Sequence, residues 1–103
     1  MSNAIGYAFG SESEIMWQRL ALSRYGCDVV YKDLGDSTRE LGLMADNHVP
    51  GDVVFIVSKG SLDRKRERLI GLMQGEGSLG EVAYLDEELG EDGLRTLVPT
   101  MPM

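Results

Sequence analysis

Residues 53–57, VVFIV, are the stretch that decides the fold class. Five consecutive apolar residues, most of them β-branched, follow the turn residues Pro50 and Gly51, and this pattern is typical of a strand buried on both faces. Strands of that kind occur mainly in parallel sheets that are covered by helices on both sides. The stretch therefore predicts an α/β fold.

The segments on either side of this strand alternate between strand-like and helix-like patterns. Three further segments are rich in β-favouring residues and have the length of strands, namely 4–9 (AIGYAF), 28–31 (DVVY) and 82–85 (VAYL). Three segments favour helices, namely 13–25, a weak stretch within 33–46, and 63–73. The alternation predicts a three-layer α/β fold with a four-stranded, mostly parallel sheet and helices on both faces.

Three polar loops follow the first three expected strands. Their sequences are GSESE at 10–14, LGDST at 34–38 and SKGSLDR at 58–64. Because ligands bind at the carboxyl ends of the strands in open parallel sheets, we expect the three loops to meet and to form any functional site.

The composition indicates one folded domain of 103 residues with a net charge of −7, from 10 Lys and Arg against 17 Asp and Glu. This charge has the wrong sign for general attraction to nucleic acid. No run approaches the roughly 20 apolar residues that span a bilayer, and the N-terminus lacks a signal-peptide pattern, so we expect a cytoplasmic protein with no membrane partner. The single cysteine, Cys27, is expected to be a buried apolar side chain, and no cofactor or metal is predicted.

Several stretches occur in an order that is known from one protein family. They are IGYAFGS at 5–11, Gln18, RYGCDVVYKD at 24–33, the PGD turn at 50–52 and VVFIVSKGSLDR at 53–64. In order and approximate spacing they resemble the N-terminal catalytic domain of the serine recombinases, the resolvase and invertase family, over residues 5–85. The resemblance implies one resolvase-like catalytic-core domain over 1–103, with a core at 4–85 and an acidic to apolar tail at 86–103. Members of the family continue into a helix-turn-helix domain, which we do not expect in this sequence.

In this family a serine attacks a DNA phosphodiester, and several arginines hold the phosphate. The resemblance places the serine at Ser11, and the other catalytic candidates that it implies are Asp63, Arg64, Arg68 and Arg39. An arginine is expected two residues before the serine, but the chain has Phe9 there, which removes a permanent cation with five donors. The resemblance thus implies an incomplete active centre.

The register of the LDR segment stays open between two alignments. In the first, Leu62, Asp63 and Arg64 keep their register, while Glu67 stands at the position of a helical arginine and Arg68 follows it. In the second, Gly60 and Ser61 stand at the Asp-Arg positions, and Arg64 becomes the helical arginine.

The residues themselves allow other interpretations of the same features. Ser11 and Glu14 match an S-x-x-E capping box, so the serine is also expected to begin a helix or to help bind a phosphate. The basic run 59–68 is either a solvated helix face with internal ion pairs or a patch for nucleic acid or an acidic partner. Four apolar residues of the first helix serve either core packing or association: Met16, Trp17, Leu20 and Leu22.

We therefore expect a degenerate, catalytically inactive resolvase-like domain that works as a protein-binding or regulatory module of phage or mobile-element origin. The expected partner is another protein or a second copy of the chain, since the net charge disfavours DNA. One alternative is active strand cleavage through Ser11. A second is an inhibitor whose acidic residues, 86–92, imitate nucleic acid to block a DNA-binding protein.

Overall fold

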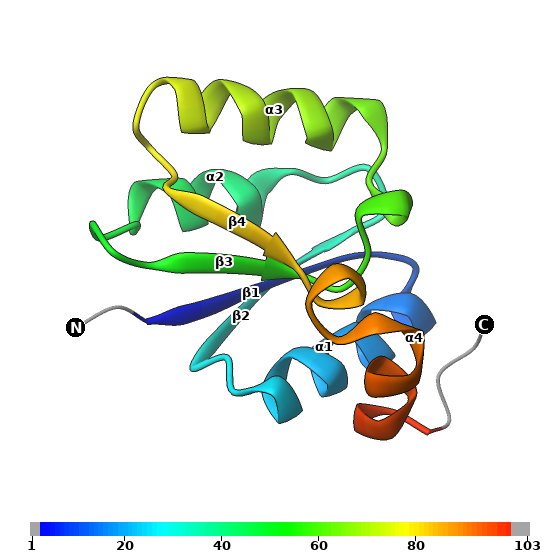
Figure 1. The fold of residues 1–103 in the computed structure, drawn as a ribbon. Coiled ribbons are helices and arrows are strands. Elements are labelled where there is room, and N and C mark those ends of the chain that lie inside the picture. Colours follow the sequence, from blue (N-terminus) through cyan, green and yellow to red (C-terminus); the bar gives the residue numbers. More distant parts are fainter. Residues whose placement is uncertain (1–2, 100–103) are drawn as a thin grey trace.

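A four-stranded sheet with helices on both faces makes up the computed structural model, which describes residues 3–99 (Figure 1). The strands are β1 (Ala4–Gly10), β2 (Val29–Leu34), β3 (Val53–Ile56) and β4 (Glu81–Tyr84), and they lie in the order β2-β1-β3-β4. All three strand pairs are parallel. The α/β class and the parallel sheet expected from the sequence are confirmed.

The helices form two layers around this sheet. They are α1 (Glu12–Tyr25), α2 (Arg39–Asp46), α3 (Arg64–Gly75) and α4 (Leu85–Leu97), with a short 3₁₀ helix, η1 (Lys59–Ser61), before α3. Helices α2 and α3 cover one face of the sheet, and α1 and α4 cover the other (Figure 1). The three-layer arrangement is thus confirmed as well.

Each face of the sheet has its own apolar core, and alternate residues of β1 contribute to both. Tyr7 and Phe9 belong to the core under α2 and α3, whereas Ala8 belongs to the core under α1 and α4. Gly6 lets α1 approach the sheet closely, because a Cβ atom there would lie 3.1 Å from the side chains of Leu22 and Val30. Strand β1 is therefore the central element of the fold.

The C-terminal segment differs from its expected form. The acidic composition of the tail at 86–103 predicts a solvated, partly frayed end, but 85–97 form helix α4, and Leu94 and Val98 are buried in the core under α1 and α4. The expected core boundary at residue 85 is therefore wrong. Four of the five acids of α4 are exposed, namely Glu87, Glu88, Glu91 and Asp92, whereas Asp86 is half-buried. This acidic composition hides the spacing of the apolar residues of the helix. Residues 100–103 lie outside the described part of the chain.

Strand β2 is longer than the 28–31 segment that the sequence predicts. It continues through Lys32, Asp33 and Leu34, which pair in register with Ala8, Phe9 and Gly10 of β1. Lysine and aspartate are poor strand formers, so tertiary pairing overrides local propensity here. No helix within residues 3–99 is long and apolar enough to cross a membrane.

Candidate functional site

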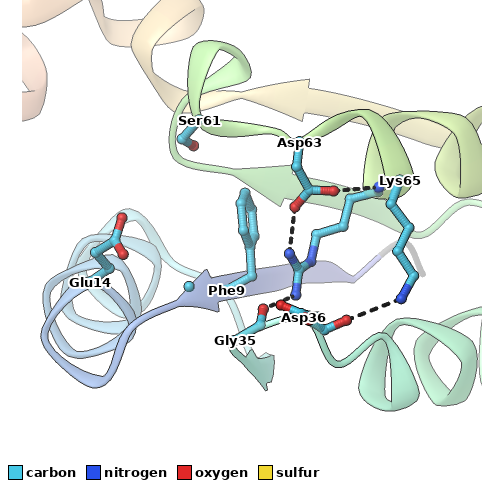
Figure 2. Close-up of a pocket in the computed structure, with 9 residues that line it drawn as sticks. Phe9, Glu14, Gly35, Asp36, Ser61, Asp63 and Lys65 are labelled. Carbon is cyan, nitrogen blue, oxygen red and sulfur yellow. Dashed lines mark hydrogen bonds and ion pairs between the residues drawn. The ribbon is translucent and has the colours of Figure 1, made fainter.

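The candidate site is a pocket at the carboxyl ends of β1 and β3, the two strands from which the chain continues in opposite directions across the sheet. From β1 the chain passes through α1 to β2 on one side, and from β3 it passes through α3 to β4 on the other side. In parallel sheets this switch point opens a crevice at the carboxyl ends of the strands. A pocket of about 520 Å³ lies there (Figure 2), and its lining residues are Phe9, Gly10, Glu14, Gly35, Asp36, Ser61, Asp63, Lys65 and Arg66.

The pocket confirms that the three strand-end loops meet. Gly10 comes from the first loop, Gly35 and Asp36 from the second, and Ser61 and Asp63 from the third. Figure 2 shows Phe9 between the Glu14 side of the pocket and the Asp63 side.

Arg66 is the main polar anchor of the pocket, and only 4% of it is exposed. Its Nη2 donates to the carbonyl oxygens of Gly35 at 2.8 Å and Ser37 at 2.6 Å, and its Nη1 donates to Asp63 Oδ2. The guanidinium lies 4.9 Å from the centre of the Phe9 ring. Arg66 therefore ties the loop after β2 to the first turn of α3.

Tyr7 links this arginine to a buried carboxylate. Its hydroxyl accepts from Arg66 Nε at 3.1 Å and donates to Asp33 Oδ2 at 2.6 Å. Burial, and then the bond to Asp33, raises the pKa of Tyr7 far above its usual value. The hydroxyl is therefore neutral and acts as a fixed bridge between Arg66 and Asp33.

Asp33, at the end of β2, holds the start of α2. Its Oδ1 accepts from the backbone amide of Glu40 at 2.9 Å, and its Oδ2 accepts from that of Leu41 at 3.1 Å. Ser37 Oγ donates to the same carboxylate at 3.2 Å. Thr38 is the N-cap residue of α2, but its side chain makes no capping bond. Asp33 accepts the bonds from the first turn of the helix in its place.

Asp63 begins α3 and pairs with Arg66 at the same time. Its Oδ1 accepts from the amide of Arg66 at 2.8 Å, which is the N-cap bond, while its Oδ2 receives the guanidinium. These contacts, the backbone bond first, lower the pKa of Asp63. The carboxylate is therefore ionised and occupied by its own helix.

Ser11 is likewise bonded to its own helix. Its Oγ accepts from the amide of Glu14 at 3.3 Å, and its amide donates to Glu14 Oε1 at 3.0 Å, which completes the capping box predicted from the sequence. The bonds to Ser11 lower the pKa of Glu14. Glu14 also lies over Gly10, where a Cβ would be 2.9 Å from Oε1. The N-terminus of α1 is thus occupied by a carboxylate of the same chain.

Gln18 fixes the strand end that carries these residues. Only 2% of Gln18 is exposed, and its side chain accepts from the amide of Phe9 at 3.1 Å and donates to the Phe9 carbonyl at 3.0 Å. The backbone N–H and C=O of Phe9 have no partner on β3, because β3 ends before it reaches them. Gln18 satisfies both groups instead. The position of the Phe9 ring is therefore set by α1 as well as by the sheet.

The other catalytic candidates lie apart from this pocket. Arg64 and Arg68 are exposed on α3 and line a separate depression of about 380 Å³, together with Lys65 and Leu69. Arg39 is exposed as the first residue of α2. Of the five candidates, only Asp63 lines the pocket, and Ser11 is exposed next to its lining residue Gly10.

The sequence reasoning did not single out Arg66, Tyr7 or Asp33 as site residues. A signal for Arg66 exists, because Arg66, Ile70 and Met73 are spaced so that they share the inward face of a helix. Because Arg66 lies among several other cations in the run 59–68, this spacing does not stand out in the sequence.

The charges that line the pocket do not favour an anion. Three carboxylates, Glu14, Asp36 and Asp63, stand against two cations, Lys65 and Arg66. Lys65 donates to the Asp36 carbonyl at 3.3 Å. Within residues 3–99, no three His, Cys, Asp or Glu side chains are grouped to hold a metal ion.

Comparison of the chain with protein-family models, with curated proteins and with solved structures gave no match in any of the three.

Proposed function

We propose that the chain is a resolvase-like domain that does not cleave DNA and that works by binding another protein. One observation carries the first half of the proposal: the serine beside the pocket and the buried arginine that lines it are both bonded within the fold. Ser11 Oγ accepts from the first turn of α1, and Arg66 is held by Asp63, Tyr7 and two carbonyls.

The chemistry of strand cleavage explains why this bonding matters. A serine that attacks a phosphodiester needs fixed cations to neutralise the charge that spreads over the phosphoryl oxygens. Phe9 supplies no charge, and Arg66 already offers four of its five N–H groups to the protein. Arg64 and Arg68 line a different depression. A phosphate in the pocket would also meet Glu14 and Asp36.

The surface supports the second half of the proposal. Of the four apolar α1 residues for which core packing and association were both open, Leu22 is fully buried and Trp17 is partly buried, but Met16 is 69% exposed and Leu20 is 40% exposed. Leu34 at the end of β2 is 56% exposed. Exposed apolar side chains that gather in one region are typical of protein interaction surfaces.

Mimicry of nucleic acid has weaker support. The acids at 86–92 lie on α4, but Gly90 has φ 71° and interrupts the helix between them. Glu91 is paired with Arg95 at 3.0 Å. The acids therefore do not form one regular row of free charges.

A covalent-adduct assay tests the loss of cleavage. The purified chain is incubated with fluorescent duplex DNA that carries nicks to trap a phosphoseryl link, and the products are separated under denaturing conditions. We expect no adduct. A band that is present in the wild type and absent in Ser11→Ala would overturn the proposal in favour of active strand cleavage.

Competitive capture tests the binding role. The tagged chain is used as bait with and without an excess of the untagged chain, and bound proteins are quantified. We expect at least one protein whose capture the untagged chain abolishes. A bait that retains nothing in a competable manner would contradict the proposed role.

A further inference from the structure

The free edge of the sheet at β2 is the feature that carries a further inference. Within residues 3–99, β2 pairs with β1 alone, so its other edge has no strand partner. Alternate peptide groups of an edge strand point away from the sheet and offer donors and acceptors to an added strand. Val29–Leu34 are six residues long, enough for such an addition.

A groove lies beside this edge on the α1 face of the sheet. We call it the β2 groove; it has a volume of about 370 Å³, and its lining residues are Glu12, Ile15, Met16, Arg19, Lys32 and Leu34. Its apolar walls are Met16 and Leu34, the most exposed of the large apolar residues described. A strand added to β2 would place every second side chain on the groove side.

The charges of the β2 groove favour an acidic occupant. Arg19 and Lys32 form no ion pair within the described residues, and Glu12 is the only acid of the lining. The groove is therefore locally positive in a chain whose net charge is −7. Opposite charges across an interface guide partner choice and encounter.

From these features we infer that β2 accepts an extended segment of a partner protein as a fifth strand, and that acidic and apolar side chains of this segment fill the β2 groove. The inference rests on the proposed protein-binding function and specifies the partner: an extended strand with an apolar residue flanked by acids on one face. Backbone bonds to β2 provide affinity, and the groove provides selectivity.

A second copy of the chain fits this edge less well. Antiparallel pairing of two β2 strands centred on Tyr31 or Lys32 places both Lys32 ammonium groups on one face, opposite or diagonal to each other. Each copy also carries the same net charge of −7, which opposes association. Lys32 thus disfavours self-pairing and selects an acidic strand.

Two labelled peptides test the inference with the intact chain. The sequence VEVLVEV presents a leucine between two glutamates on one face in either strand direction, and VKVLVKV is its charge-reversed control. We expect the acidic peptide to bind about tenfold more tightly in fluorescence anisotropy, because two partly exposed charge pairs change sign. Amide hydrogen exchange should show new protection in β2.

Matched variants assign the binding to the β2 groove. Leu34→Asp should weaken the acidic peptide about tenfold, because an apolar contact is lost and a negative charge is added. Leu72→Asp changes a leucine on α3 that is 54% exposed, and it should leave affinity within about twofold. Lys32→Glu should reverse the preference between the two peptides.

The outcomes separate the inference from the proposed function. The inference would be overturned if both peptides bound equally well. It would also be overturned if the peptide protected amides only outside β2 from hydrogen exchange, or if protection of β2 depended only on the concentration of the chain. If competable capture of a protein persists in Leu34→Asp and Lys32→Glu, the binding function stands and the β2 docking site falls. If no protein is captured and neither peptide binds, both fall.

Discussion

Arg66 illustrates at the residue scale how a cation near a strand-end pocket becomes part of the fold. Five of the ten cations of the chain lie in the run 59–68, yet only Arg66 is buried. Burial of a guanidinium is tolerated because Asp63 supplies the opposite charge, and because two carbonyls and Tyr7 accept three more of its five N–H groups. The same bonds leave only one of its five N–H groups for a ligand in the pocket.

The Tyr7 hydroxyl gives a pH prediction. Its pKa in the folded chain lies above the ordinary value of 10.0, mainly because of burial, so the neutral hydroxyl stabilises the fold fully below about pH 10. This stability is lost as the pH rises further. In urea unfolding, we expect the free energy of unfolding to fall more steeply above about pH 10 in the wild type than in Tyr7→Phe.

Tyr7→Phe should also cost about 1–3 kcal/mol near neutral pH, because Asp33 and Arg66 each lose a hydrogen-bond partner. Tyr31→Phe is the control, since it leaves this bridge in place and should keep the steep alkaline slope. Equal slopes in the wild type and Tyr7→Phe would contradict the assigned role of the hydroxyl.

Phe9→Arg tests whether the pocket tolerates the arginine that the resemblance implies at this position. The ring is 4% exposed, stacks on Tyr7 at 5.4 Å and lies beneath the Arg66 guanidinium. A second buried cation without a partner should lower the free energy of unfolding by about 3–5 kcal/mol in urea titrations. Phe9→Leu, which keeps an apolar side chain, should cost about 1 kcal/mol. A Phe9→Arg chain as stable as the wild type would show that the site accepts a cation.

At the scale of elements, the helices α1, α2 and α3 each have a carboxylate of the chain bonded to their first turn. Asp63 caps α3, Glu14 completes the cap of α1, and Asp33 occupies the start of α2. Helix N-termini commonly bind phosphate and other anions. In this chain the carboxylates of these residues occupy that position. The helix starts that border the pocket, those of α1 and α3, therefore need no ligand to complete their caps.

Ser11→Ala tests the capping role of the serine. Loss of the bond from the Glu14 amide should lower the free energy of unfolding by about 1 kcal/mol in urea titrations. Ser11→Asp, which retains a capping oxygen, should restore most of it, and Ser23→Ala on the exposed side of α1 should have little effect. If Ser11→Ala is as stable as the wild type, the serine is not retained as a helix cap.

Helix α4 provides a prediction about the C-terminal segment. Leu94 is 5% exposed and packs in the core under α1 and α4, so Leu94→Ala should lower the free energy of unfolding by about 2–5 kcal/mol. Leu72→Ala, at an exposed position of α3, should change it by about 0.5 kcal/mol or less. Chemical denaturation of both variants measures the difference. Similar values for the two would mean that α4 contributes little to the core.

At the scale of the whole molecule, the two cores share one thin sheet. Val54 and Ile56 belong to the core under α2 and α3, whereas Phe55 and Val57 contribute to the core under α1 and α4. Both layers of helices therefore pack against side chains of the same strands. The two faces should therefore fold as one unit.

This coupling predicts two-state unfolding of the intact chain. Trp17, which packs against the core under α1 and α4, reports on one face by fluorescence, and far-ultraviolet circular dichroism reports on all helices. The two urea transitions should coincide in midpoint and slope. Separate transitions would show that the layer of α2 and α3 unfolds independently.

Much of the fold could be predicted because its signals are local. The apolar runs of β1 and β3 and the capping box at Ser11 each act within a few residues. Parallel strands buried on both faces also imply the layers of helices. Helix α4 was missed because its buried positions are few and its exposed positions are strongly acidic.

The sequence by itself determined the α/β class, the alternation of strands and helices, and the loops that would meet, since apolar periodicity and turn chemistry depend on near neighbours. Only the tertiary structure decided which cation is buried and which edge is open. Arg66 meets Tyr7 and Gly35, 59 and 31 residues away, because the strand order β2-β1-β3-β4 brings three chain segments to one end of the sheet. The same order leaves the outer edge of β2 without a strand partner within residues 3–99, a property that no local pattern specifies.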